Sequence, residues 1–283
     1  LIRIKLFRCR HNMYGAYMRI EEITFIEKLL YSVSDVISQS YMKRDTIPVV
    51  TKDHINDFLT EVDVHVQELL VSQIRSQYPH DAVLAEESGL NEMICSSESR
   101  CWVIDPLDGT QNFLRGLFPE FGVSIGFVDN GNPVAGGVIL PVSGDMFLAE
   151  RNAGAYRNGK RMKVSTSENF AQSRVDIDLG GLTHRKASMS QAKNVFIQAG
   201  QIRSYGCAVI GFCQVADGLQ DAYITFQAKP WDIAAGQLLV EEAGGKVTSF
   251  SGEVLTPFDA DKVGIISNGV LHQTCIHALD TED

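Results

Sequence analysis

Two carboxylates stand three positions apart where an apolar run of the chain meets a turn. Residues 102–104 predict a buried strand, Pro106 interrupts its hydrogen-bonding ladder, and a helix can begin at Thr110. Asp105 and Asp108 would then lie at the carboxyl end of a strand, where open α/β sheets bind their ligands. Two acids on one short turn repel each other. The pattern therefore indicates divalent cations held by oxygen ligands at least as readily as acid–base chemistry.

Three further acids occur near the ends of predicted elements. Glu86 follows a short apolar strand, Asp232 opens an alanine-rich helix, and Asp63 lies three positions after Thr60 near the start of another helix. Taken singly, each has a structural explanation: Glu86 as a capping acid, and Asp63 and Asp232 as first-turn acids favoured by the helix dipole. Taken together with the first pair, Glu86 and Asp232 complete an oxygen-only set of four acids with neither His nor Cys, which favours Mg²⁺ or Mn²⁺ over zinc. A two-metal oxygen site is typical of phosphoryl transfer.

The elements that must position these acids follow from hydrophobic periodicity. An apolar stripe predicts a helix over 20–42, a polar stretch at 49–57 is expected to form a loop, and a second amphipathic helix is expected to include Phe58 and to run through Ile74. Further strands are predicted at 82–85, 122–128, 134–140, 145–150, 194–199, 221–226, 246–250 and 263–267. Further helices are predicted at 204–218, from 232 to 243, and from about 270 onward. The run of strands over 122–162 lacks helical crossovers, which indicates an antiparallel meander.

Composition bounds the function. The 283 residues are 45% hydrophobic and 21% charged, with 25 basic residues against 35 acidic ones and a net charge of −10. Such an acidic protein is a poor candidate for general nucleic-acid binding, and no apolar run approaches the length of a membrane span. The six cysteines form no C-x-x-C pair, so we expect free thiols and a cytoplasmic location. The basic segment 1–19 is expected to be an upstream extension, in preference to a targeting peptide.

Three segments resemble the motifs of one family, the inositol monophosphatase-like, Mg²⁺-dependent and typically lithium-sensitive phosphatases. Residues 85–88 are similar to its G-E-E-S motif, 102–113 to W-I-I-D-P-I-D-G-T-x-N-F, and 231–236 to W-D-x-A-A-G. The resemblance runs from about residue 20 to the C-terminus. It implies an α/β fold of alternating αβαβα layers and, commonly, a homodimer. We expect an N-terminal half at 20–165 that binds metal and a C-terminal half at 166–283 that completes the active site.

The resemblance also implies roles for individual residues. The implied ligands of two or three Mg²⁺ ions, with Mn²⁺ as an alternative, are Glu86, Asp105, the Leu107 carbonyl, Asp108 and Asp232. The implied catalytic residues, which prepare the attacking water, are Asp63, Thr110 and Glu86. The implied substrate-binding residues are Lys52, Asp108, Gly109, Thr110, Gly206, Cys207, Ala208, Thr225 and Asp232. We expect Cys207 to pack rather than to act as a nucleophile, because it has no evident basic partner.

The resemblance leaves the substrate open. The expected substrate is a small phosphomonoester, such as inositol monophosphate or a related sugar or polyol phosphate. Thr225 stands where animal members carry a glutamate that contacts the inositol ring. Fructose-1,6-bisphosphatase activity is an alternative, and the short spacing between Glu86 and Asp105 disfavours a 3′(2′),5′-bisphosphate nucleotidase. An alternative of another class is a regulatory binding protein, since some bacterial relatives associate with RNA polymerase.

Overall fold

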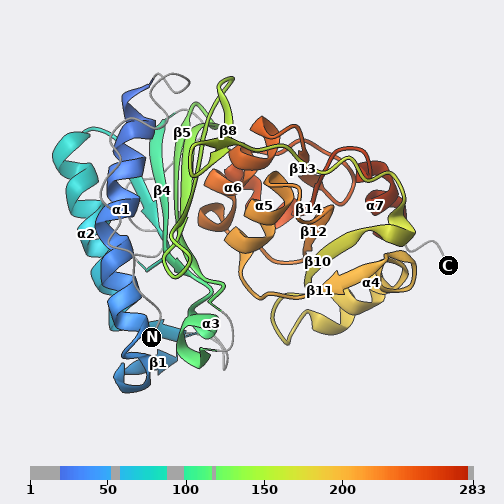
Figure 1. The fold of residues 1–283 in the computed structure, drawn as a ribbon, viewed down its shortest axis with the longest axis horizontal. Coiled ribbons are helices and arrows are strands. Elements are labelled where there is room, and N and C mark those ends of the chain that lie inside the picture. Colours follow the sequence, from blue (N-terminus) through green and yellow to red (C-terminus); the bar gives the residue numbers. More distant parts are fainter. Residues whose placement is uncertain (1–19, 52–57, 88–98, 117–118, 280–283) are drawn as a thin grey trace.

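The helices and sheets of the chain alternate as five layers (Figure 1). The computed structural model describes residues 20–51, 58–87, 99–116 and 119–279. Within these residues, two helices cover a seven-stranded sheet, a second pair of helices separates it from a five-stranded sheet, and a third pair covers the far face. The predicted αβαβα architecture is therefore confirmed. The predicted boundary between 165 and 166 falls between the two sheets and stays a prediction.

The first helical layer consists of α1 (Glu21–Tyr41) and α2 (Glu61–Gln77). Helix α1 follows the predicted stripe: its apolar residues at helical spacing are buried against the seven-stranded sheet. Two expectations nearby are wrong. Residues 49–51 form strand β1 (Val49–Thr51) instead of a loop, and Phe58 belongs to strand β2 (Phe58–Thr60), which pairs with β1. A helix cannot extend back to Phe58, because Thr60 caps it.

The seven-stranded sheet carries the first acidic motif. In spatial order, its strands are β3 (Ala82–Ala85), β4 (Arg100–Asp108), β5 (Gly122–Asp129), β6 (Asn132–Leu140), β7 (Asp145–Glu150), β8 (Gly154–Arg157) and β9 (Lys160–Arg161). Strand β3 runs parallel to β4, and the following strands form the predicted antiparallel meander. Pro106 does not end β4 as expected. The ladder continues to Asp108 across a register shift that begins after Asp105, so a bulge accommodates the proline.

The expectation of free thiols is wrong for one cysteine. Cys101, which is fully buried on β4, is disulfide-bonded. Cys207, Cys213 and Cys275 are free and buried. The prediction failed because it relied on the absence of a short regular spacing, and a bridge can join cysteines at any separation that the fold brings together.

The middle helical layer consists of α5 (Ala208–Ala216) and α6 (Pro230–Glu242). Helix α6 packs closely on β5 and β6, because glycines on the sheet face its alanines. A Cβ atom at Gly126 would lie 2.6 Å from the Cβ of Ala234, and one at Gly136 would lie 2.9 Å from the Cα of Ala235. This close approach fixes the N-terminus of α6 beside the end of β4.

The five-stranded sheet and the third helical layer complete the fold. In spatial order, its strands are β11 (Gln201–Arg203), β10 (Arg174–Asp178), β12 (Ala222–Thr225), β14 (Val263–Ser267) and β13 (Lys246–Ser249). The outer helices are α4 (Arg185–Gln198) and α7 (His272–Leu279). The remaining helical segments are the short helix α3 (Thr110–Arg115) and the 3₁₀ turns Arg44–Thr46, Phe170–Gln172 and Pro257–Lys262.

One predicted strand is a helix. Residues 194–199 were expected to be extended, but most of them form the end of α4. Ser188, Ala192 and Val195 are the buried residues of this helix, and they recur every three or four positions. The strand that pairs with β11 and β12 is instead β10, which the sequence did not predict.

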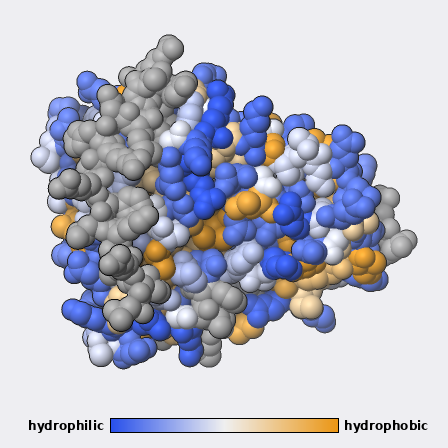
Figure 2. Space-filling model, viewed as in Figure 1, coloured by the Kyte–Doolittle hydropathy of each residue, from blue (hydrophilic) through white to orange (hydrophobic). Residues whose placement is uncertain are grey.

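The surface in the view of Figure 2 is mostly hydrophilic, with small and separate hydrophobic areas. This distribution accords with the excess of acidic residues. Among the described residues, no helix combines the length and the apolar character that crossing a membrane requires.

Candidate active site

The bulge at the end of β4 presents two of the predicted acids. Asp105 is 1% exposed, and its Oδ1 accepts a hydrogen bond of 3.0 Å from the Leu107 backbone N–H. Asp108 ends the strand, and Gly109 then takes a left-handed conformation, with φ of 83°, before α3 begins at Thr110. Only glycine adopts this conformation freely, so the reversal predicted here is encoded by Gly109.

The start of α2 places Asp63 against the same turn. Asp63 and Thr60 form a capping box: the Thr60 backbone N–H donates to Asp63 Oδ2 at 2.9 Å, and the Thr60 hydroxyl donates to the same oxygen. The other oxygen, Oδ1, accepts from the Thr110 hydroxyl at 3.2 Å. That hydroxyl also lies 3.0 Å from the Leu107 carbonyl. Asp63 is 1% exposed, so the expectation of a solvated first-turn acid, which its position alone favoured, is wrong.

The start of α5 holds Asp108. Asp108 Oδ2 accepts a hydrogen bond of 2.6 Å from the Val209 backbone N–H and one of 3.2 Å from the Cys207 thiol. Burial raises the pKa of the Cys207 thiol well above its usual value, and the negative charge of Asp108 adds to this effect. Cys207 is therefore a protonated hydrogen-bond donor, in agreement with the expectation that it is not a nucleophile.

The start of α6 brings Asp232 to the end of β4. Asp232 Oδ2 accepts from the Lys229 backbone N–H at 2.7 Å. The preceding residue, Trp231, accepts a hydrogen bond of 3.3 Å at its carbonyl from the Ser124 hydroxyl. Ser124 is the partner of Asp105 in the β4–β5 ladder. The sheet thereby ties Asp232 and Asp105 together although 127 positions separate them in the sequence.

The acids at the ends of β4 and β3 and at the start of α6 lie close enough to repel one another. Burial raises the pKa of Asp105 well above its usual value, and the negative charges of Glu86, Asp108 and Asp232 raise it further. Burial likewise raises the pKa of Asp232, with added repulsion from Asp108 and Glu86. The pKa of Asp108 rises to about 6, chiefly through burial, although the hydrogen bonds from Val209 and Cys207 oppose the rise. Neighbouring negative charges thus raise the pKa values of Asp105, Asp108 and Asp232, and a bound cation would stabilise the charged forms of these three acids.

The donor set fits hard divalent cations. The carboxylates offer oxygen ligands only, and their shared burial and repulsion would be relieved by positive charge. In the described part of the chain, however, no three or more His, Cys, Asp or Glu side chains are grouped so that they could hold a metal ion as they stand. The backbone N–H groups of Leu107, Val209 and Lys229 each hold one oxygen of Asp105, Asp108 and Asp232, respectively. Each of these carboxylates has a second oxygen to offer.

The predicted substrate-binding residues are partly brought to this site. Cys207 contacts Asp108, and Ala208 is the first residue of α5, so the loop that includes Gly206 lies beside the acids. Thr225 is 1% exposed, and its hydroxyl donates to the Gln227 carbonyl at 2.9 Å. Lys52 lies outside the described residues.

The prediction missed two groups at the site. Asp178, at the end of β10, raises the pKa of both Asp108 and Asp232 by its negative charge, and it is the ladder partner of Thr225. The alternation of apolar and charged residues over 174–178 was the signal that could have placed it. The second group is the Val209 N–H that holds Asp108. No side-chain motif encodes that contact.

A layered αβαβα fold with an acid-lined site at its strand and helix ends is the architecture of a class of phosphomonoester hydrolases, and the comparisons with known proteins agree. The model of the inositol monophosphatase family matches residues 19–283. The chain belongs to the inositol monophosphatase family and is a phosphomonoester hydrolase.

Three similar proteins illustrate the range of the family. The chain is 33% identical over 267 residues to a protein of Thermotoga maritima named fructose-1,6-bisphosphatase/inositol-1-monophosphatase, covering 92% of this chain and 96% of that protein. It is 34% identical to Nus factor SuhB of Xylella fastidiosa, over 83% of this chain and 84% of the relative. Among solved structures, an inositol monophosphatase/NADP phosphatase complexed with NADP and Ca²⁺ superposes with a TM-score of 0.80 at 26% identity, covering 93% of this chain and 97% of that one.

Proposed function

We propose that this chain hydrolyses a small sugar or polyol phosphate, such as inositol monophosphate, in a reaction that depends on Mg²⁺. The convergence of Glu86, Asp105, Asp108 and Asp232 on one turn supports this proposal most strongly. The names of the relatives, which include inositol monophosphatase and fructose-1,6-bisphosphatase, support the substrate class.

The proposed cation ligands are Glu86, Asp105, the Leu107 carbonyl, Asp108 and Asp232, which would hold two or three Mg²⁺ ions, or Mn²⁺ in their place. Bound cations would supply Lewis acidity that activates water and offsets the charge of the phosphate. Asp105 and Asp108 are already fixed by hydrogen bonds at one oxygen each. Because no three such side chains among the described residues are yet grouped to hold an ion, binding would draw the carboxylates closer together.

Thr110 and Asp63, together with Glu86, are proposed to prepare the attacking water. The Thr110 hydroxyl donates to Asp63, so its lone pairs are free to accept a hydrogen bond from water. A proton released by that water can pass to Thr110 while the Thr110 proton passes to Asp63. Burial raises the pKa of Asp63, which makes its carboxylate a stronger proton acceptor than an exposed one.

The proposed phosphate contacts are the backbone N–H groups of Gly109 and Thr110 together with Lys52. The leaving group is proposed to lie against the loop of Gly206, Cys207 and Ala208, with Thr225 nearby, and Asp108 and Asp232 are proposed to contact the substrate as well. A Cβ atom added at Gly206 would meet nothing within 4 Å, which suits a loop that borders a ligand.

A phosphate-release assay tests the proposal. The substrates are inositol-1-phosphate, fructose-1,6-bisphosphate, a 3′-phosphonucleotide and NADP, each with Mg²⁺ and with EDTA. The variant is Asp105→Asn, and the control is Asp259→Asn, which makes the same change at a capping-box acid outside the proposed ligand set. We expect release that requires Mg²⁺, is abolished in Asp105→Asn and persists in Asp259→Asn. Metal-independent release, or equal release by Asp105→Asn, would contradict the proposal.

A second candidate function is regulatory binding. The similarity to Nus factor SuhB supports it, and the two functions are compatible. Purified bacterial RNA polymerase, mixed with the chain and separated by size, tests it directly. Comigration that Asp105→Asn preserves would support a binding function independent of catalysis.

The oligomeric state, lithium inhibition and location of the protein are part of the same proposal. We propose that the chain forms a homodimer, which light scattering measures. We also propose that lithium inhibits the phosphatase activity, which assays in LiCl measure. We also propose a cytoplasmic location, which three free thiols support and the Cys101 disulfide opposes. The oxidation state of Cys101 can be measured in protein that is isolated without reductant and treated with a thiol-blocking reagent. An oxidised Cys101 in the isolated protein would contradict a cytoplasmic location.

A further inference from the structure

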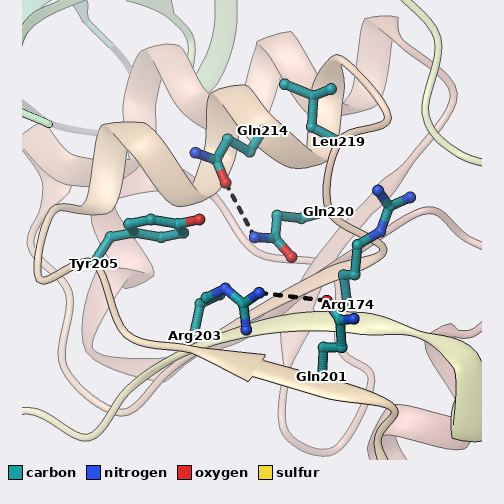
Figure 3. A pocket seen from close by; sticks show the side chains of 7 residues that line it. All are labelled: Arg174, Gln201, Arg203, Tyr205, Gln214, Leu219 and Gln220. Atoms are coloured by element: carbon teal, nitrogen blue, oxygen red, sulfur yellow. Dashed lines mark hydrogen bonds between the residues drawn. The ribbon is translucent and has the colours of Figure 1, made fainter.

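A small cavity lies at the edge of the five-stranded sheet, where β10 and β11 face α5 (Figure 3). Its volume is about 250 Å³. The lining side chains come from both strands, from α5 and from the segments that flank this helix: Arg174, Gln201, Arg203, Tyr205, Gln214, Leu219 and Gln220. The volume is below the ~300–1,000 Å³ of a pocket for a drug-sized ligand, so the cavity suits a small metabolite.

Two guanidinium groups give the cavity a positive charge within an acidic protein. Arg174 has a half-exposed side chain and lies 3.9 Å from the Asp221 carboxylate, a long contact for an ion pair. Arg203 donates to the Ile202 carbonyl at 2.9 Å and to Gln201 Oε1 at 3.4 Å. Among the described residues, no carboxylate forms an ion pair with Arg203. Guanidinium groups without close counter-ions bind phosphate and carboxylate groups in a fork geometry.

A buried acceptor in the same cavity has no partner. Gln220 is 5% exposed, and its amide N–H₂ donates to Gln214 Oε1 at 3.1 Å. This bond fixes the amide, so Gln220 Oε1 faces the arginines across the cavity (Figure 3), and Oε1 has no hydrogen-bond partner. A buried carbonyl oxygen of this kind is stabilised by a donor. An ionised carboxylate bound by the arginines has no proton to donate.

We propose that this cavity binds a small metabolite that carries a phosphate or carboxylate group for Arg174 and Arg203, and a hydroxyl or amino group that donates to Gln220. Tyr205 and Leu219 form the less polar wall against which its carbon atoms pack. The site is separate from the candidate active site and does not depend on the proposed function.

One loop connects the cavity to the acids of the active site. The Tyr205 N–H donates to Asp176 at 3.3 Å, and its carbonyl accepts a hydrogen bond of 2.8 Å from Asn112 in α3. Two residues further on, Cys207 donates to Asp108. A ligand that packs against Tyr205 therefore acts on the segment that holds Asp108 and α3. We expect occupancy of the cavity to change KM for the phosphomonoester.

Binding measured without metal separates this site from catalysis. Equilibrium dialysis in EDTA uses three probes: inorganic phosphate, phosphoethanolamine, which adds an amino donor, and malonate, which replaces phosphate by carboxylates. We expect phosphoethanolamine to bind roughly tenfold more tightly than phosphate, because its ammonium group can donate to Gln220 while all of its phosphate oxygens stay available to the arginines. Competition by malonate shows whether carboxylates enter as well; its failure restricts the ligand class to phosphates.

Three variants test the assignment of residues. Arg174→Gln combined with Arg203→Gln should weaken phosphoethanolamine binding by roughly tenfold or more. Gln220→Leu should abolish the preference for phosphoethanolamine over phosphate and keep phosphate binding. Arg185→Gln, which removes an exposed arginine from α4, serves as the matched control and should bind like the wild type.

Other outcomes would overturn the proposal. These are the absence of binding of every probe at millimolar concentration, equal binding by the double arginine variant, or loss of binding in Asp105→Asn, which would place the probe in the active site. Light scattering tests whether the two arginines serve an interface between copies of the chain instead. If the arginine substitutions change the oligomeric mass and leave phosphoethanolamine affinity intact, the two arginines serve an interface between copies of the chain and the proposal is wrong.

Discussion

The Thr110 hydroxyl donates a hydrogen bond of 3.2 Å to Asp63 Oδ1, and it thereby joins the first residue of α3 to the first turn of α2. The Leu107 carbonyl, at 3.0 Å, is a second acceptor for the same proton. A hydroxyl has one proton, so it can satisfy only one of these oxygens at a time. This shared proton makes Thr110 the natural link between a water molecule and the Asp63 carboxylate.

Thr110→Val should lower kcat by roughly 10²–10³-fold, because it removes the hydroxyl and keeps the side-chain volume. KM should change little, since the hydroxyl is not expected to bind the leaving group. The measurement is steady-state kinetics with Mg²⁺. The matched control is Thr256→Val, which removes a capping hydroxyl that donates to Asp259 at 2.8 Å. The control should lose about 1 kcal/mol of stability and retain kcat. An unchanged kcat in Thr110→Val would exclude Thr110 from the reaction.

Asp232→Asn should lower kcat by several orders of magnitude and keep the fold, because it removes charge and not volume. Burial and neighbouring acids raise the pKa of Asp232, so the neutral side chain relieves repulsion in metal-free protein. The Asn oxygen can still accept from the Lys229 N–H. Thermal unfolding in EDTA should therefore show no loss of stability. On addition of Mg²⁺, the wild type should gain more stability than the variant. Unfolding of the variant in EDTA would show that Asp232 is mainly structural.

Periodicity predicted most of the fold and failed where local pattern and tertiary packing disagreed. The stripe of α1 identifies this helix because one of its faces is buried. Strands β5 to β7 are identified by their nearly continuous apolar and small residues, because helices cover both faces of their sheet. The end of α4 was misassigned because Val195 and Ile197 have high β-propensity. Helical packing on α7 overrides that propensity. Strand β10 was missed because its charged residues interrupt the apolar run.

The candidate site was predictable where a residue type carries the chemistry. Asp105, Asp108 and Asp232 stand in motifs whose acids are evident from the sequence. Other groups that act on these acids come from elsewhere in the chain. The Val209 N–H donates to Asp108, and Asp178, whose strand pairs with β12, repels Asp108 and Asp232. Such contacts depend on register and topology. One sequence alone contains no local signal for them.

Gly109→Ala should disturb both stability and activity, and Gly206→Ala provides the matched control. Both glycines have positive φ, 83° and 64°, so alanine costs about 1–2 kcal/mol at either position. At Gly109 the added Cβ would also lie 3.0 Å from the Glu120 carbonyl and 3.1 Å from Cys207 Sγ, whereas at Gly206 it would meet nothing within 4 Å. Cys207 contacts Asp108, so only Gly109→Ala should displace a site carboxylate.

Urea unfolding and steady-state kinetics measure the two effects of this pair. We expect Gly109→Ala to be the less stable variant and to lose at least roughly tenfold in kcat/KM, as expected for a misplaced site group. Gly206→Ala should lose stability with a smaller effect on kcat/KM. Equal losses of activity in the two variants would show that the contact between Cys207 and Asp108 does not position the site.

His272 should make stability depend on pH between about 6.5 and 4. The ring is 5% exposed, with Nδ1 2.8 Å from the Ser267 hydroxyl and Nε2 2.9 Å from the Thr248 hydroxyl. Burial, aided by the charge of Lys246, lowers its pKa from 6.5 to about 4. Between these values the unfolded chain binds a proton that the folded chain does not. Stability is therefore lost as the pH falls through this range, by up to about 3 kcal/mol, with no further loss from this residue below pH 4.

The buried acids of the active site have the opposite effect, because their raised pKa values make the folded chain bind more protons as the pH falls. The contribution of His272 is isolated by subtracting the unfolding free energy of His272→Gln from that of the wild type at each pH. This difference should decline from pH 6.5 to pH 4 and then level off. His277→Gln, which alters an exposed histidine of the same helix, should follow the wild type throughout. A difference between wild type and His272→Gln that does not vary with pH would show that the folded protein protonates His272 as readily as the unfolded chain does.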